Sequence, residues 1–290
     1  MSRAFIFPGQ GSQTVGMGKD VADAFASARE VFEEIDEALS QNLSKLMFEG
    51  PDEDLILTEN AQPAIMAVSL AVMRVLSKDG GVDLSNTVAY VAGHSLGEYS
   101  ALAAAGCFTI ADTARLLKTR GRAMQEAVPV GEGAMAALIG LEPDVAAAVA
   151  NEAAGDGVCT AANDNAPGQV VVSGDAAAVD RAIEIAQARG AKRAIILPVS
   201  APFHCALMAP AAEVMAEALE AVNMSPLAVP LVANVTAGVV TDASEIRQLL
   251  VEQVTGMVRW RECVLTLKDQ GVDSLVEVGA GKVLSGLARR

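Results

Sequence analysis

The sequence is poor in aromatic residues, histidine and positive charge. Aromatic side chains make up 3% of the 290 residues, and there are only two histidines. The chain has 21 lysines and arginines against 36 aspartates and glutamates, so its formal net charge is −15. This charge argues against a general nucleic-acid-binding protein, because contact with phosphates needs a basic surface. The shortage of histidine also disfavours a zinc site built from cysteine and histidine.

Long apolar runs and closely spaced cysteines are also missing. No segment approaches the ~18 apolar residues that a membrane span needs, and the apolar part of the first eight residues is too short for a signal peptide. The four cysteines are far apart and form no C-x-x-C pair, which fits a reduced, cytoplasmic setting. They are Cys107, Cys159, Cys205 and Cys263.

The glycine-rich segments do not match the common nucleotide-binding motifs. In the loop that starts at Gly9, Thr14 stands where a dinucleotide-binding fingerprint needs glycine. Near the end of the chain, Val283 follows Gly281-Lys282 where a P-loop needs serine or threonine. The loop at 9–18 is therefore either an ordinary strand-to-helix turn or a place where backbone and amide groups approach a ligand. The residues alone leave both interpretations open.

A G-x-S-x-G pentapeptide is the main chemical motif that is present. Gly93-His94-Ser95-Leu96-Gly97 lies between a predicted strand at 88–92 and a predicted helix at 98–105. Such a pentapeptide also arises by chance, but this context is typical of a nucleophile elbow, in which glycines allow close strand–helix packing and the serine is strained and exposed. The N–H of Leu96 would then lie at a helix N-terminus, near the serine oxygen, where it suits an oxyanion.

A serine nucleophile needs a base, and the chain offers few candidates. His94 leaves the turn beside Ser95 and is badly placed to take its proton, so His204 is the only other histidine available. A hydrogen-bonded structural role is the alternative for His204. No acid precedes it in a loop typical of a triad, so a backbone carbonyl could equally hold the imidazole tautomer. The acids considered for a third position are Asp242, Asp269 and Asp273.

Arg120 belongs to a short basic segment, 118–122, in an otherwise acidic chain. Most arginines on helices are solvated, so a solvated surface position is the simpler interpretation of Arg120. A buried arginine beside the serine would instead bind a substrate carboxylate through two hydrogen bonds. The residues alone do not choose between these two roles.

The order of predicted elements indicates an α/β fold with an insertion. The segment 134–199 is expected to run strand, helix, strand, strand, helix, strand, the order of a ferredoxin-like unit. We therefore expect a large hydrolase-like subdomain with a mostly parallel sheet at 1–130 and 200–290, and a small ferredoxin-like subdomain at 131–199. The other expected strands are 4–7, 231–235 and 274–278, and the other expected helices are 20–48, 61–76, 110–127, 211–222, 246–254 and 262–268.

Six segments together resemble the malonyl-CoA:acyl carrier protein transacylases of bacterial type II fatty acid synthesis. The resemblance covers essentially the whole chain, in the right order, and implies a hydrolase-like α/β domain with a ferredoxin-like insertion. It also implies that Ser95 accepts the acyl group and that His204 is its base. The segments are Phe7–Gln13, Gly93–Glu98, Arg120-Gly121, Asn163–Gln169, Pro202–His204 and Val276–Leu284.

The same resemblance assigns the remaining site residues. Gln10 and the Leu96 amide would form the oxyanion hole, and Arg120 would pair with the malonyl carboxylate. The backbone carbonyl of Gln253 would orient His204, which would explain the missing acid. The resemblance also places Asn163 and Phe203 at the substrate, since related polyketide synthase acyltransferases with phenylalanine before the histidine prefer malonyl.

The activity implied by the resemblance is a ping-pong transfer. Malonyl would pass from malonyl-CoA to Ser95 and then to the phosphopantetheine thiol of acyl carrier protein, with no metal or bound cofactor. A monomer is the default expectation. Because carrier proteins are acidic, we expect Lys192 and Arg193 to form a local basic patch that receives the carrier.

Three other interpretations follow from the same residues. A serine hydrolase or thioesterase would release free malonate and would not need Arg120. A carrier-binding module without catalysis would have no use for an intact serine, histidine and arginine set. Acyltransferase domains of polyketide synthases share the motifs, but a chain that starts at its own Met1 favours a discrete enzyme. The family usually continues past the equivalent of Arg290, so this chain is expected to be shorter at its C-terminus.

Overall fold

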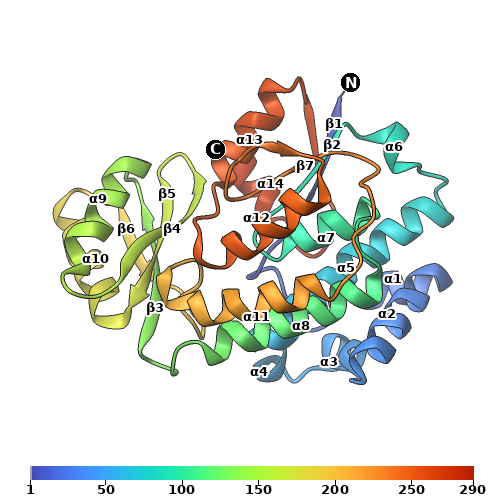
Figure 1. Ribbon diagram of the computed structural model, residues 1–290, viewed down its shortest axis with the longest axis horizontal. Helices are drawn as coiled ribbons and strands as arrows, with labels where there is room; N and C mark the ends of the chain where they lie inside the picture. The colour runs from blue at the N-terminus through green and yellow to red at the C-terminus, as the bar shows by residue number, and fades with distance from the viewer. Residues whose placement is uncertain (1) are drawn as a thin grey trace.

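The computed structural model describes residues 2–290 and contains two separate sheets (Figure 1). The larger sheet has five strands in the order β8-β7-β2-β1-β9. β1 pairs in parallel with β2 and β9, β2 pairs in parallel with β7, and only β8 is antiparallel to its neighbour. The predicted mostly parallel sheet is therefore confirmed. Its strands are β1 (Arg3–Phe7), β2 (Tyr90–Gly93), β7 (Leu231–Val232), β8 (Val239–Val240) and β9 (Ser274–Glu277).

The second sheet is antiparallel throughout and has the order β4-β5-β3-β6. The chain order β3, α9, β4, β5, α10, β6 is that of the predicted ferredoxin-like unit, which has its own core of small apolar side chains. This unit lies at one end of the molecule in Figure 1. Its elements are β3 (Gly133–Ile139), α9 (Pro143–Ala154), β4 (Cys159–Ala166), β5 (Gln169–Asp175), α10 (Ala176–Ala188) and β6 (Arg193–Ile196).

Helices surround the larger sheet, and two of them carry the main features of the site. α7 (Gly97–Ala104) follows β2 directly, and α8 (Ile110–Glu126) packs against α5 (Thr58–Lys78), which is largely buried along its first two thirds and carries the polar Thr58, Asn60 and Gln62 there. The others are α1 (Lys19–Ala24), α2 (Ala26–Leu39), α3 (Leu43–Glu49), α4 (Asp52–Leu55), α6 (Leu84–Thr87), the 3₁₀ turn η1 (Ala206–Met208), α11 (Ala209–Glu220), α12 (Ala243–Thr255), α13 (Trp260–Asp269) and α14 (Val283–Ala288).

The structure corrects two of the expected elements. The single helix expected at 20–48 is three helices, because Phe25 is extended (φ −129°, ψ 125°) and Ser40 adopts a left-handed conformation (φ 48°). The strand expected at 231–235 ends at Val232, and the backbone N–H of Asn234 bonds instead to the buried Glu98 side chain. The short elements α4, α6, β8 and α14 were not predicted.

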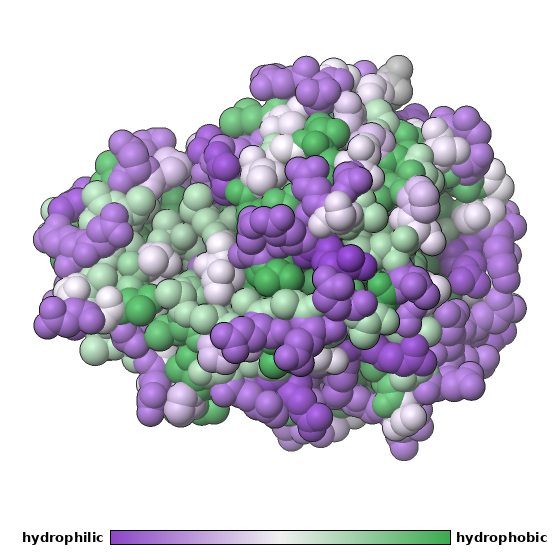
Figure 2. Space-filling model, in the orientation of Figure 1, coloured by the Kyte–Doolittle hydropathy of each residue, from purple (hydrophilic) through white to green (hydrophobic). Residues whose placement is uncertain are grey.

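Hydrophilic side chains cover much of the face shown in Figure 2, with apolar ones in smaller groups among them. The core below is built largely from alanine, valine and leucine, as expected for a chain with so few aromatic residues. Within residues 2–290, none of the helices combines the length and the apolar composition needed to cross a membrane.

Candidate active site

The nucleophile elbow forms where β2 meets α7. Ser95 has a positive φ of 54°, which is uncommon for a residue with a side chain and typical of a strained turn. A Cβ atom on Gly93 would overlap the carbonyl of Gly97, and one on Gly97 would overlap the carbonyl of Phe7 at the end of β1. The two glycines therefore let the elbow sit directly against the first strand and its following loop.

Replacing Gly93 with alanine is expected to destabilise the protein by about 3 kcal/mol or more, because the backbone contact leaves no room for a methyl group. Chemical denaturation followed by circular dichroism measures this loss. Gly286→Ala in α14 is the matched control, since a Cβ there meets nothing within 4 Å. A Gly93→Ala protein as stable as Gly286→Ala would contradict the steric argument.

Ser95 and His204 are in hydrogen-bonding contact. Ser95 Oγ lies 2.8 Å from His204 Nε2, and His204 Nδ1 lies 2.7 Å from the backbone carbonyl oxygen of Gln253. That carbonyl is in the last turn of α12, where helix carbonyls lack a partner within the helix and carry partial negative charge. The arrangement assigns the Nδ1–H to the carbonyl and leaves Nε2 to accept the serine proton. A helix end thus occupies the place of a triad acid.

His204 is 4% exposed, and this burial sets its protonation state. Burial, and after it the positive charge of Arg120, lower the pKa of His204 to about 3. At neutral pH the imidazole is therefore uncharged and able to accept a proton.

Arg120 is 1% exposed and lies beside Ser95. One of its terminal nitrogens donates to Ser95 Oγ at 3.2 Å and to Gln253 Oε1 at 2.8 Å, and the other donates to Gln62 Oε1 at 2.8 Å. Its guanidinium also lies 5.6 Å from the centre of the Tyr99 ring. The plain interpretation of Arg120 as a solvated surface residue is therefore wrong.

A cavity of about 470 Å³ opens between the two sheets and contains Ser95, His204 and Arg120. Gln10, His94, Asn163 and Phe203 also line it, so four more of the residues singled out above lie around one space. The volume is within the range of small-molecule sites. Gln10 donates from its side chain to Thr58 Oγ1 at 3.3 Å. Within residues 2–290 no group accepts the Leu96 N–H, which leaves this donor available to an oxyanion.

Most of the other candidate residues lie away from this cavity. Asp242 caps α12 by accepting from Ser244 and Glu245 N–H groups, and Asp269 and Asp273 are exposed. None of the three makes a hydrogen bond with His204. Lys192 and Arg193 are exposed at the start of β6, outside the cavity lining. His94 lines the cavity but bonds to Asn165 Oδ1 at 2.8 Å, away from the serine proton.

Sequence reasoning missed three buried polar residues, Gln62, Glu98 and Asn234. Gln62 holds Arg120, while Asn234 Oδ1 accepts the Ser95 N–H at 2.8 Å and its Nδ2 donates to the Gly93 carbonyl at 2.7 Å. Glu98 accepts from Gln253 and Asn234. A charged residue inside an otherwise apolar helix was the one signal that could have drawn attention to Glu98.

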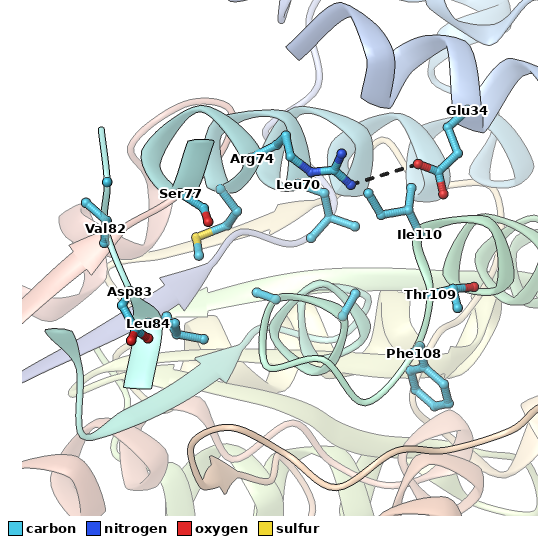
Figure 3. A pocket seen from close by; sticks show the side chains of 14 residues that line it. Glu34, Leu70, Arg74, Ser77, Val82, Asp83, Leu84, Phe108, Thr109 and Ile110 are labelled. Atoms are coloured by element: carbon cyan, nitrogen blue, oxygen red, sulfur yellow. Dashed lines mark ion pairs between the residues drawn. The ribbon is translucent and has the colours of Figure 1, made fainter. Parts of the chain in front are cut away.

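A second cavity, of about 650 Å³, lies near the C-terminal end of α7 and is not lined by Ser95 (Figure 3). Figure 3 shows Arg74 reaching toward Glu34, with 3.9 Å between the paired atoms, above apolar side chains such as Leu70 and Ile110. Its lining contains no histidine or cysteine. Of these two cavities, only the smaller one is lined by both Ser95 and His204.

Comparison with known proteins agrees with this geometry. Residues 4–287 match the family model described as acyl transferase domain. The malonyl CoA-acyl carrier protein transacylase of Escherichia coli strain K12 is 48% identical over 287 residues, which are 99% of this chain and 92% of that protein.

Two solved structures extend the comparison to the fold. The acyl-carrier-protein-S-malonyltransferase of Bartonella henselae is 57% identical, with a TM-score of 0.98 over 100% of this chain and 92% of that one. A malonyl-transacylase solved in complex with its type II polyketide acyl-carrier protein is 43% identical, with a TM-score of 0.96 over 100% of this chain and 93% of that one. With its elbow, buried arginine and two-sheet architecture, the chain belongs to the malonyl CoA-acyl carrier protein transacylase family of acyl transferases.

Proposed function

We propose that the protein transfers a malonyl group from malonyl-CoA to the phosphopantetheine thiol of acyl carrier protein, and so supplies fatty acid synthesis. The observation that carries this proposal is the buried Arg120 guanidinium, 3.2 Å from the nucleophilic oxygen. A buried cation without an anionic partner is costly, so the cavity favours an acyl group that carries its own carboxylate. Malonyl carries a carboxylate at the end opposite its thioester, and acetyl has none.

In the first half-reaction, Ser95 Oγ attacks the thioester carbonyl of malonyl-CoA. His204 Nε2 takes the serine proton as the oxygen–carbon bond forms, and the Leu96 N–H and Gln10 stabilise the developing oxyanion. The carbon–sulfur bond then breaks. His204 returns its proton to the sulfur, coenzyme A leaves as a thiol, and malonyl remains as an ester on Ser95.

The second half-reaction runs the same steps in the opposite direction. The carrier's thiol gives its proton to His204 and attacks the malonyl–Ser95 ester through the same oxyanion site. The serine oxygen leaves and recovers the proton. Asn163 and Phe203 are assigned to the cavity wall around the acyl group, because both line it and both are nearly buried.

The proposal assigns no metal or bound cofactor to this reaction. Nucleophile, base and carboxylate partner are supplied by the chain itself, with Ser95 Oγ at hydrogen-bonding distance from both His204 and Arg120, and Gln10 lines the same cavity. We further propose a cytoplasmic location, which fits four buried free cysteines in a reducing compartment, and a monomer.

Intact-protein mass spectrometry after brief mixing with malonyl-CoA tests the function. We expect a malonyl adduct that disappears when phosphopantetheinylated carrier protein is added, with the same mass gained by the carrier. Decay of the adduct to free malonate without labelling of the carrier would indicate a hydrolase. Carrier binding without any adduct would indicate a non-catalytic binding module.

The carrier is proposed to dock near the exposed start of β6. Replacing Lys192 and Arg193 together with glutamate is expected to raise KM for carrier protein about 3- to 10-fold, because like charges slow the encounter of two acidic proteins. KM for malonyl-CoA should stay the same, as neither side chain lines the cavity. Steady-state kinetics with each substrate varied in turn measures both constants.

Lys268→Glu is the control for this experiment. Lys268 is exposed near the C-terminal end of α13, and this helix end lies by the amino end of β2, where Tyr90 bonds to Gln270. Ser95 follows the opposite, carboxyl end of β2, so Lys268 is a surface lysine remote from the cavity. A carrier KM that is unchanged in the double variant, or that rises equally in the control, would contradict this docking site.

A further inference from the structure

Glu98 is a buried carboxyl group one turn from the nucleophile, and the proposed reaction does not use it. It lies in the first turn of α7 and is 1% exposed. One of its oxygens, Oε2, accepts hydrogen bonds from Gln253 Nε2 at 2.7 Å and from the Asn234 N–H at 3.2 Å. A buried carboxyl group is costly unless nearby donors or a positive charge compensate it, so its position calls for a role.

The Gln253 side chain joins Glu98 to Arg120. Its Nε2 donates to Glu98, and its Oε1 accepts from the Arg120 guanidinium at 2.8 Å. A glutamine amide has donors on one end and an acceptor on the other. With Glu98 ionised, only one orientation of the amide satisfies both neighbours. A neutral Glu98 accepts a weaker hydrogen bond than an ionised one, so its hold on the amide loosens.

The same contacts reach the nucleophile elbow. Gln253 Nε2 also donates to the Ser95 carbonyl at 3.0 Å, and the Gln253 backbone carbonyl accepts a hydrogen bond from His204 Nδ1–H. Asn234, whose N–H binds Glu98, accepts the Ser95 N–H. Gln253 is therefore placed to position base, guanidinium and elbow at once, and among residues 2–290 Glu98 is the only carboxylate that binds its side chain.

We propose that Glu98 is a positioning residue which, through the Gln253 amide, holds the Arg120 guanidinium against Ser95 and so sets the preference for an acyl group that carries a carboxylate. The inference rests on the proposed malonyl transfer. Glu98 touches neither substrate nor the reacting atoms, so its effect is expected on acyl selectivity rather than on the attack of Ser95 itself.

Titration of Glu98 gives the proposal a separate readout. Burial raises the pKa of Glu98 to about 7, while the bonds from Gln253 and Asn234 and the charge of Arg120 oppose that rise. The other titratable groups that face it are Tyr99 of α7 and Cys263 of α13, and burial raises the pKa of each further above neutral pH, so they stay uncharged. Glu98 is ionised above its pKa and becomes neutral as the pH falls through it.

The experiment compares wild type, Glu98→Gln and Glu98→Asp. The rate of Ser95 acylation is measured by rapid-quench mass spectrometry, with malonyl-CoA and acetyl-CoA, from about pH 5.5 to about pH 8.5. For Glu98→Gln we expect malonyl acylation at the upper pH to fall about 10- to 100-fold, as for loss of a hydrogen bond to a charged group. Acetyl acylation should change much less, and Glu98→Asp should restore part of the malonyl rate.

The pH profile of the wild type is the second measurement. Its malonyl rate should fall as the pH drops through about 7, its acetyl rate should not, and Glu98→Gln should lack the step. Glu277→Gln is the control, since Glu277 is a half-buried carboxyl that accepts from the Leu284 and Ser285 N–H groups at the sheet edge.

Four outcomes would overturn the proposal. Equal loss of malonyl and acetyl rates in Glu98→Gln would show a purely structural role. An unchanged malonyl rate, or a wild-type pH step that persists in Glu98→Gln, would show that Glu98 does not act on Arg120. Wild type that forms no malonyl adduct at any pH would overturn the proposed function together with this inference, and is distinguished from the others by that result alone.

Discussion

Replacing Ser95 with alanine is expected to abolish the malonyl adduct and to lower turnover by about 10⁴-fold or more. Ser95 Oγ is the only hydroxyl that His204 Nε2 contacts, and no second nucleophile lies within hydrogen-bonding distance of that imidazole in residues 2–290. Removing the oxygen leaves the oxyanion donors and Arg120 in place but provides no atom to acylate. Intact-protein mass and single-turnover kinetics with malonyl-CoA measure the loss.

Ser100→Ala is the matched control for this prediction. Ser100 lies within α7, the helix that begins two residues after Ser95. The buried Ser100 Oγ has no hydrogen-bond partner within residues 2–290. The control protein should therefore form the adduct at the wild-type rate. Labelling of Ser95→Ala with malonyl at a comparable rate would contradict the assignment of the nucleophile.

Replacing Arg120 with alanine is expected to lower kcat/KM for malonyl-CoA by about 10³-fold, because the substrate carboxylate would enter a buried site without its partner. Acetyl-CoA has no carboxylate to lose, so the ratio of malonyl to acetyl acylation should fall by a similar factor. Arg120→Lys keeps the charge but not the two-nitrogen fork that reaches Gln62 and Gln253, so we expect it to recover only part of the loss.

Arg120→Ala should also change the acid side of the pH profile of acetyl acylation. The charge of Arg120 is the second cause, after burial, that lowers the pKa of His204 to about 3. Without that charge the pKa of His204 should rise, and acetyl acylation should begin to fall at a higher pH than in wild type, because protonated His204 cannot act as a base.

Arg122→Ala is the control for both effects. Arg122 is two residues away on α8, and its side chain is 68% exposed beside the exposed Glu126. Since an exposed pair of this kind contributes little, the control should keep the wild-type selectivity and pH profile. Equal selectivity in Arg120→Ala and wild type would contradict a role for Arg120 in binding the malonyl carboxylate.

Features that depend on neighbouring residues could be predicted from the sequence. The elbow at Gly93–Gly97 follows from the steric demands of one tight turn between a strand and a helix, and both flanking elements are where the pattern placed them. The strand and helix order of the inserted unit follows from local hydrophobic periods. His204 was identified because the chain contains only one other histidine.

Features that depend on contacts between distant parts of the chain required the tertiary structure. Whether Arg120 is solvated or buried depends on Gln62 and Gln253, which are 58 and 133 positions away, and no pattern within α8 records them. The breaks at Phe25 and Ser40 likewise interrupt a helical period that the local sequence continues.

The sequence therefore predicted the elbow around Ser95 and the α/β fold with its insertion, because local sterics and periodicity encode them, and it indicated His204 as the base because histidine is so scarce. The resemblance had already implied the Gln253 carbonyl beside His204, whereas the burial of Arg120 and the bracing of the elbow by Glu98 and Asn234 became visible only in the folded chain. The physical reason is desolvation: buried polar groups must find partners, and folding supplies those partners from segments that are remote along the chain.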